Sequence, residues 1–178
     1  GRDPDVLYPV WWVDPVSGSD TNNGYRPSTP FKTLKYALTG NRVTFGSQIN
    51  LMAGLSNEGS VSFTPSINIT AKAAQDNYPV WVRGRGRKAS VFQLDLVGAS
   101  IAAVTANYPM RYSAMTMINN GSGGMNFSTG PGTAVTKTVE FDDVVLISGG
   151  SNIKQESAGV ILREYDASAG TNGWTVYA

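Results

Sequence analysis

The sequence predicts an all-β fold built as a solenoid, in which successive coils of chain stack through parallel strands. The composition favours β structure, because charged residues make up 15% of the chain, against roughly 25% in ordinary soluble domains, and 20 residues are glycine. From residue 48 onward, short apolar or alternating segments follow one another between turn-rich stretches. Some of these segments recur at nearly equal spacing, which is typical of coils of one size.

The internal repeat has a period of about 29 to 30 residues. Asn77-Tyr78-Pro79 recurs as Asn107-Tyr108-Pro109, and each copy precedes an apolar segment. The stretch 112–118 aligns with 141–147 at nearly the same spacing, and a Gly-containing turn follows both. The chain from 49 to 178 then makes about four coils. The alternation predicts that three side chains face the interior: Phe141, Val144 and Leu146.

One segment, 30–38, has a helical pattern. Its apolar residues recur at helical spacing: Phe31, Leu34, Ala37 and Leu38. We expect Thr29 to cap the start of this helix and Gly40 to end it. A helix in this place suits the open end of the first coil, whose strands would otherwise be exposed. We therefore divide one structural domain into an N-terminal arm, motif and capping helix (1–40) and a solenoid (41–178).

Charge and missing residue types exclude much chemistry. The chain has a formal net charge of +1 and contains neither cysteine nor histidine. Disulfides, thiolate nucleophiles, Ser-His-Asp triads and the usual zinc sites are therefore excluded, and we predict no metal and no cofactor. No apolar run is long enough to span a bilayer, and no global field favours nucleic acid, so neither membrane insertion nor nucleic-acid binding is expected. Carboxylate-based glycosidase or lyase chemistry and pure binding both remain.

A motif near the N-terminus carries a family resemblance. It comprises Trp12-Val13-Asp14-Pro15, Gly18-Ser19-Asp20, Gly24, Pro30-Phe31-Lys32-Thr33-Leu34 and Ala37-Leu38. This stretch resembles the N-terminal part of right-handed parallel β-helix proteins of the pectate-lyase-like superfamily, which includes bacteriophage tailspikes and other virion appendages. The resemblance implies a right-handed parallel β-helix of about four turns behind an N-terminal capping helix. Lyases, hydrolases and inert attachment modules share this motif, so it does not fix the activity.

Three acidic residues are the candidates for catalysis. Glu140 and Asp142 stand two apart on an expected strand, so both would face outward at a separation compatible with glycoside hydrolysis. Asp95 could extend the same groove from a neighbouring coil. The alternative is that these residues only keep the outer wall polar, with Asp143 at a corner before Val144. Pectate lyases use clustered aspartates with calcium and an arginine base, and no equivalent cluster can be matched here, which argues against lyase activity.

The loop near the N-terminus also has two interpretations. Asp14, Asp20 and Asn22, with the carbonyl near Gly24, superficially resemble a calcium loop. The pattern lacks a third carboxylate and a closing glutamate, so we favour Asx turns that shape a tight loop.

The candidate binding residues are Arg83, Arg85, Arg87 and Trp81. The three arginines belong to the run 83–88, which is dense in cations and ends on Lys88. Guanidinium groups favour carboxylates and phosphates, so this run could bind an acidic polysaccharide, a lipopolysaccharide phosphate or an acidic patch on another protein. Trp81 offers a flat face for a sugar ring. The alternatives are a solvated Gly-rich turn and burial of the tryptophan.

We therefore predict a non-enzymatic phage virion protein of the tailspike or tail-fibre type, which binds a host surface polysaccharide, other virion proteins, or both. A raw strand edge at Trp174-Thr175-Val176-Tyr177 predicts a homo-oligomer such as a trimer, located in the extracellular virion. Two alternatives stay open: a polysaccharide depolymerase, hydrolase or lyase, acting on the same wall, and a capsid decoration protein without affinity for glycans.

Overall fold

The fold was determined as a computed structural model. It describes residues 9–44, 46–60, 79–94, 101–103, 110–119, 124–126, 139–148, 160–162 and 165–169. The described elements are β1 (Val10–Val13), α1 (Leu34–Leu38), β2 (Gln48–Leu51), β3 (Gly54–Asn57), β4 (Val80–Arg83), β5 (Ser90–Leu94), β6 (Ile101–Ala103), β7 (Met110–Asn119), β8 (Gly124–Asn126), β9 (Val139–Ser148), β10 (Val160–Leu162) and β11 (Tyr165–Ala169).

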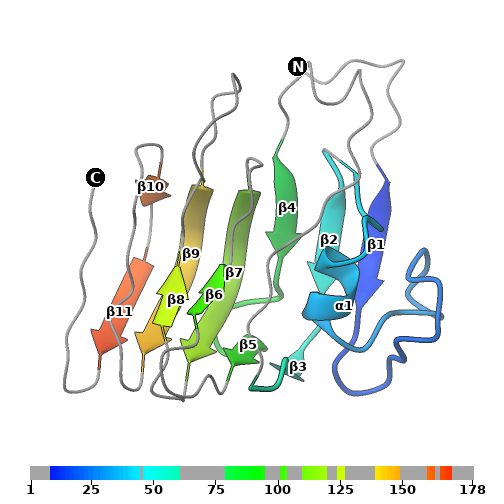
Figure 1. The fold of residues 1–178 in the computed structure, drawn as a ribbon, viewed down its shortest axis with the longest axis horizontal. Helices are drawn as coiled ribbons and strands as arrows, with labels where there is room; N and C mark the ends of the chain where they lie inside the picture. The colour runs from blue at the N-terminus through cyan, green and yellow to red at the C-terminus, as the bar shows by residue number, and fades with distance from the viewer. Residues whose placement is uncertain are drawn as a thin grey trace.

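Nine of the described strands form one parallel sheet. The order along the main path is β1-β2-β4-β7-β5-β3, and β9 joins at β7 and pairs in turn with β10 and β11. Figure 1 shows these strands side by side, with α1 lying over the β1 and β2 end. The strands β6 and β8 form a separate parallel pair. The described part of the chain is thus a parallel-sheet structure with one short helix.

The prediction of an all-β, right-handed parallel β-helix of about four turns is wrong, because the observed sheet is open and does not close on itself. The physical reason lies in β7 and β9, each ten residues long. The first half of β7 pairs with β4 and its second half with β5, so the strands on both sides belong to one sheet. Both strands continue through one residue in the left-handed region, Ala114 (φ 52°) in β7 and Asp143 (φ 58°) in β9.

The strand pairing that the internal repeat predicts is confirmed. Val80 pairs with Met110, and these are the residues that directly follow the two copies of Asn-Tyr-Pro. Tyr112 pairs with Phe141, and these are the first residues of the two aligned stretches 112–118 and 141–147. The repeat therefore correctly identified which segments lie next to one another, although it did not reveal that the ladders share one open sheet.

The core lies on one face of the sheet. One inward row crosses five strands in register: Trp11, Ile49, Val82, Tyr112 and Phe141. All five are buried, and the rings of Tyr112 and Phe141 stack with centroids 5.7 Å apart. The predicted inward residues Phe141, Val144 and Leu146 are confirmed as buried. The helix contributes Leu34, Ala37 and Leu38 to the same cluster.

The helix is shorter than predicted and begins at Leu34. Its N-cap is Thr33, whose hydroxyl accepts from the Tyr36 N–H, so the expected cap at Thr29 is wrong. The reason is that Phe31 is extended: its N–H donates to the Trp12 carbonyl, and its carbonyl accepts from the Asp14 N–H. A residue paired in this way with β1 cannot also form the first helical turn.

Asx residues shape the loop before the helix, as expected. The Asp14 carboxylate accepts from the N–H groups of Val16 and Ser17. The hydrogen bond from the Ser17 hydroxyl lowers the pKa of Asp14. The Asp20 carboxylate accepts from the N–H groups of Lys32 and Thr33 and from the Thr33 hydroxyl, which fixes the start of α1. These carboxylates are therefore used to organise the loop.

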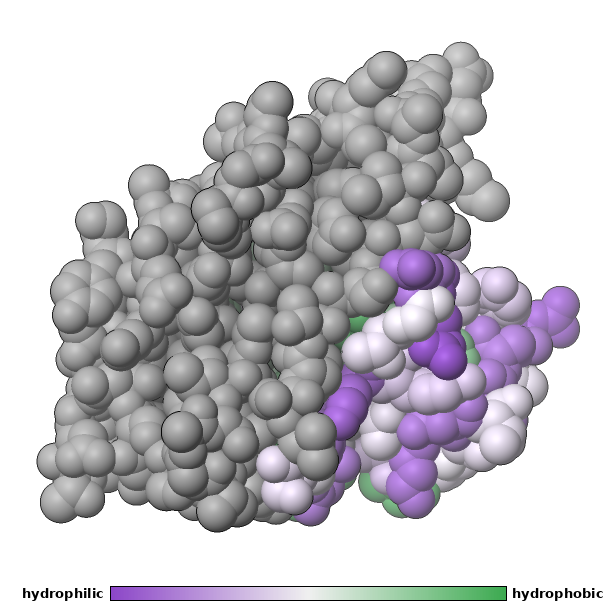
Figure 2. Space-filling model, viewed as in Figure 1, coloured by the Kyte–Doolittle hydropathy of each residue, from purple (hydrophilic) through white to green (hydrophobic). Residues whose placement is uncertain are grey.

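On the face drawn in Figure 2, most of the described surface is polar, with small apolar areas. Within the described ranges, no helix combines the length and the apolar composition that crossing a bilayer requires. The division of the chain at residue 40 stays a prediction.

Candidate functional site

The face of the sheet opposite the core carries rows of polar and aromatic side chains. Because side chains alternate along a strand, the neighbours of the buried residues point outward. One row, in register across five strands, consists of Trp12, Asn50, Arg83, Ser113 and Asp142. Trp11 and Trp12 accordingly lie on opposite faces of β1, since Trp11 is buried and Trp12 is half-buried.

A second outward row runs beside the first. It consists of Val10, Gln48, Trp81, Arg111 and Glu140, again one residue from each of β1, β2, β4, β7 and β9. The chemical type and charge of the outward side chains therefore change from β1 to β9. Aromatic and amide groups lie on β1 and β2, arginines on β4 and β7, and carboxylates on β9.

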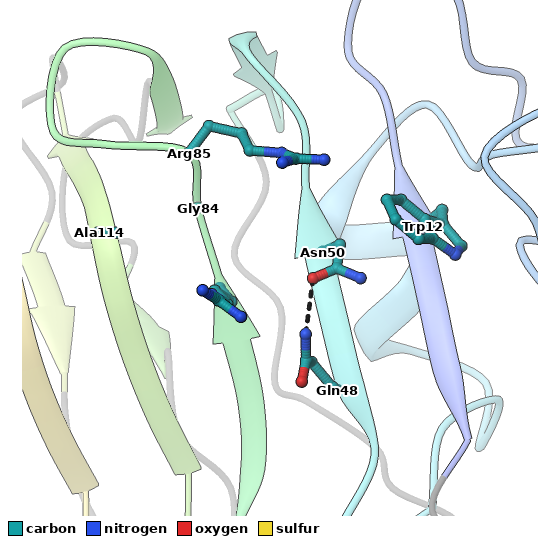
Figure 3. A pocket seen from close by; sticks show the side chains of 7 residues that line it. Trp12, Gln48, Asn50, Gly84, Arg85 and Ala114 are labelled. Carbon is teal, nitrogen blue, oxygen red and sulfur yellow. Dashed lines mark hydrogen bonds between the residues drawn. The ribbon is translucent and has the colours of Figure 1, made fainter.

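A groove of about 490 Å³ lies over the first half of this face (Figure 3). Its lining consists of Trp12, Gln48, Asn50, Arg83, Gly84, Arg85 and Ala114. The Gln48 amide donates to the Asn50 Oδ1 at 2.8 Å, which orients both amides. In Figure 3 the Trp12 ring stands at one side of the groove, and Arg85 reaches from the β4 side toward β2.

Gly84 forms the floor of the groove where the chain leaves β4. Its N–H donates to the Ser113 carbonyl at 2.8 Å. A Cβ at this position would lie 2.1 Å from the Ala114 carbonyl oxygen, a backbone atom that cannot move aside freely. The close approach of the two backbones therefore requires glycine, and it fixes the path of the chain between Arg83 and Arg85.

The groove is electropositive, because Arg83 and Arg85 are both exposed and neither has a carboxylate partner among the described residues. The Arg83 guanidinium lies 5.4 Å from the centroid of the Trp81 ring. The Arg85 guanidinium has only a weak contact, 3.4 Å, with the Met52 sulfur. The lining contains no acidic residue to offset these two charges.

The structure separates Arg87 from the other two predicted arginines. Its Nε lies 2.5 Å from the Asp143 Oδ1 at the bend in β9, and its carbonyl accepts from the Thr116 hydroxyl. Arg87 therefore fastens the 83–88 turn to the sheet and does not line the groove. Three residues predicted for binding, Trp81, Arg83 and Arg85, stay together on the outward face.

Trp81 lies next to the groove and contacts Arg83, which lines it. Its indole N–H donates to the Ser113 hydroxyl at 2.7 Å. The Arg111 guanidinium lies 4.5 Å from its ring centroid, close enough for a cation–π contact. Trp81 does not line the groove, so the ring face that the groove offers belongs to Trp12.

The two carboxylates predicted as catalytic candidates do face outward, as expected. Both are engaged by one guanidinium: Arg111 Nη2 lies 2.8 Å from Asp142 Oδ2, and Arg111 Nε lies 3.5 Å from Glu140 Oε1. Neither carboxylate lines the groove. The third candidate, Asp95, lies outside the described residues.

The sequence did not identify the amide pair Gln48 and Asn50. The sequence predicts a short apolar or alternating segment at 48–52, and the structure has a strand at Gln48–Leu51, along which alternation places both amides on one face. The sequence could not predict which strands lie on either side of this one. Only the register with β1 and β4 brings the amides between Trp12 and Arg83.

No protein-family model matches the chain, and neither a curated protein nor a solved structure gives a significant match. The resemblance of residues 12–38 to pectate-lyase-like proteins therefore stays a prediction.

Proposed function

We propose that this chain is a non-enzymatic attachment module that binds a host surface polysaccharide in the groove over β1, β2 and β4. One observation carries the proposal: the groove places an aromatic ring, two oriented amides and two cations side by side, without a carboxylate in its lining. Stacking on Trp12 recognises the apolar face of a sugar ring. The amides of Gln48 and Asn50 supply donors and acceptors for its hydroxyl groups.

The position of the carboxylates supports binding over cleavage. A glycosidase needs two carboxyl groups on either side of the scissile bond. Here Glu140 and Asp142 both interact with Arg111, and they lie on β9, three strands from Gln48 and four strands from Trp12. A sugar bound on Trp12 is therefore not held between them.

The setting proposed for the module is a phage virion of the tailspike or tail-fibre type. The resemblance of residues 12–38 to virion appendages supports this setting. In this proposal the chain forms homo-oligomers, such as trimers, and contacts other proteins of the particle. The segment 174–177, where self-association is expected, lies outside the described residues.

Binding of the purified chain to a panel of bacterial surface polysaccharides tests the proposal. We expect saturable binding of at least one polysaccharide, and Trp12→Ala lowers the affinity about tenfold because the ring contact is lost. Tyr25→Ala is the matched control, since Tyr25 is an exposed aromatic residue outside the groove. Binding to no glycan on the panel, or equal loss in both variants, contradicts the proposal.

The same preparations distinguish the alternatives. Release of new reducing ends from a bound polysaccharide, abolished by Asp142→Asn, indicates a depolymerase. Saturable binding to virus particles without any glycan affinity indicates a decoration protein. Binding without cleavage supports the attachment module.

A further inference from the structure

We infer that the glycan bound in this groove is anionic, and that Arg83 and Arg85 together receive its carboxylate, phosphate or sulfate group. This inference rests on the proposed function and specifies the chemical class of its ligand.

Two of the described arginines on the outward face form ion pairs with carboxylates. Arg111 interacts with Glu140 and Asp142, and Arg87 interacts with Asp143. These pairs lie on the β7 and β9 side, where each guanidinium has a carboxylate within reach.

Arg83 and Arg85 differ from these two arginines. Among the residues that the structure describes, neither has an acidic partner, and both line the groove. Their positions are also fixed by the backbone. Gly84 between them is held against Ala114, and the Arg85 N–H donates to the Ser90 hydroxyl at 2.8 Å. The backbone of both arginines is thus fixed at the same wall of one groove, and two exposed guanidinium groups that line one groove favour an anionic ligand.

The spacing within the groove fits a sugar with an acidic substituent. Trp12 and Arg83 stand in the same outward row, two strands apart. At roughly 4.8 Å between paired strands, their backbones are roughly 10 Å apart. Asn50 lies between them, and its amide is already oriented by Gln48. A ring on Trp12 therefore brings its hydroxyl groups to the amides and an acidic group, on that sugar or the next, to the guanidiniums.

The carboxylates of the same face do not compete for these arginines. Asp142 belongs to the row of Arg83 but lies two strands beyond it, on the far side of Ser113. Arg111 interacts with Asp142 and also lies over Trp81, so it separates the acidic side of the face from the groove. The positive potential at Arg83 and Arg85 is therefore available to a ligand.

The first test compares polysaccharides before and after removal of their charge. Each polysaccharide that binds is measured again after its carboxyl groups are reduced to alcohols, after its phosphates are removed, or after its sulfates are removed. We expect every bound polysaccharide to be acidic and one of the three treatments to lower its affinity about a hundredfold. The effective treatment identifies which anionic group the arginines receive.

The second test uses charge-matched variants. Arg83→Gln and Arg85→Gln each lower the affinity for the acidic polysaccharide about tenfold, and the double variant lowers it about a hundredfold. The matched control is the double variant Arg26→Gln with Lys88→Gln, which removes the same net charge at two exposed positions outside the groove lining. The control is expected to bind within about twofold of the unaltered chain, as is normal for distant surface charges.

The outcomes separate this inference from the proposed function. Tight binding of a neutral polysaccharide, or binding that survives both charge removal and the Arg83 and Arg85 variants, overturns the anionic ligand and leaves the attachment module intact. Binding of no polysaccharide overturns both. Equal losses in the groove variants and the control variant show a general charge effect and also overturn the inference.

Discussion

Glu58 is a buried carboxyl group at the start of α1, and replacing it with Gln is expected to change how the stability of the protein depends on pH. The residue is 5% exposed. Its carboxylate accepts from the N–H groups of Leu34 and Lys35 at 3.0 and 2.9 Å and from the Ser56 hydroxyl. Glu58 thus connects the first turn of the helix to the end of β3.

The expected magnitude follows from its pKa. Burial raises the pKa of Glu58 to about 7 from the ordinary value of 4.5, against the opposing effect of its hydrogen bonds, and the nearby charge of Asp20 adds to the increase. The folded chain therefore holds this proton more tightly than the unfolded chain. Its stabilising contribution is full below pH 4.5 and is lost as the pH rises through about 7. At about 1.4 kcal/mol per pKa unit, the loss is about 3 kcal/mol.

Urea denaturation followed by tryptophan fluorescence, at constant ionic strength from about pH 4.5 to about pH 8, measures this effect. The window is favourable because the chain contains no histidine. We expect the free energy of unfolding of the unaltered chain to fall by about 3 kcal/mol more than that of Glu58→Gln across this range. Asp14→Asn is the control, since the pKa of Asp14 is lowered and its contribution changes only at more acidic pH.

The two proteins are compared by how steeply their free energy of unfolding changes with pH, because the Gln substitution also changes the absolute stability. A Gln side chain faces one of the two helix N–H groups with an NH₂ group, so its absolute stability also changes. That change does not depend on pH. If Glu58→Gln and the unaltered chain show parallel pH profiles, the carboxyl group does not titrate in this window and the account of its burial is refuted.

Four further substitutions, at three positions, test the packing and the loop. Gly84→Ala places a Cβ 2.1 Å from the Ala114 carbonyl oxygen, so we expect a loss of about 2 kcal/mol in urea denaturation together with weaker glycan binding. Asp20→Ala removes three hydrogen bonds at the start of α1 and is expected to cost about 2 kcal/mol, with reduced helix signal in circular dichroism. Phe141→Ala is expected to cost about 4 kcal/mol and Phe141→Leu clearly less, because the ring stacks on Tyr112 in the core; equal losses would contradict this.

Much of the candidate site was within reach of the sequence, because it depends on alternation along single strands. Arg83 and Arg85 were predicted as binding residues and lie in the groove, and Glu140 and Asp142 were predicted to face outward and do so. Arg87, predicted in the same run, pairs with Asp143 and does not line the groove. Spacing in the chain could not show that Arg87 turns toward Asp143, 56 residues away.

The sequence by itself determined which segments pair and which side chains face the core, since the repeat period and the alternation of side chains are both written along the chain. The tertiary structure decided whether the paired strands close into a helix or form one open sheet. The two halves of β7 and of β9 meet at left-handed backbone at Ala114 and Asp143, and alanine has no intrinsic preference for that conformation. The same long-range register, and no local signal, places the amides of β2 between Trp12 and Arg83.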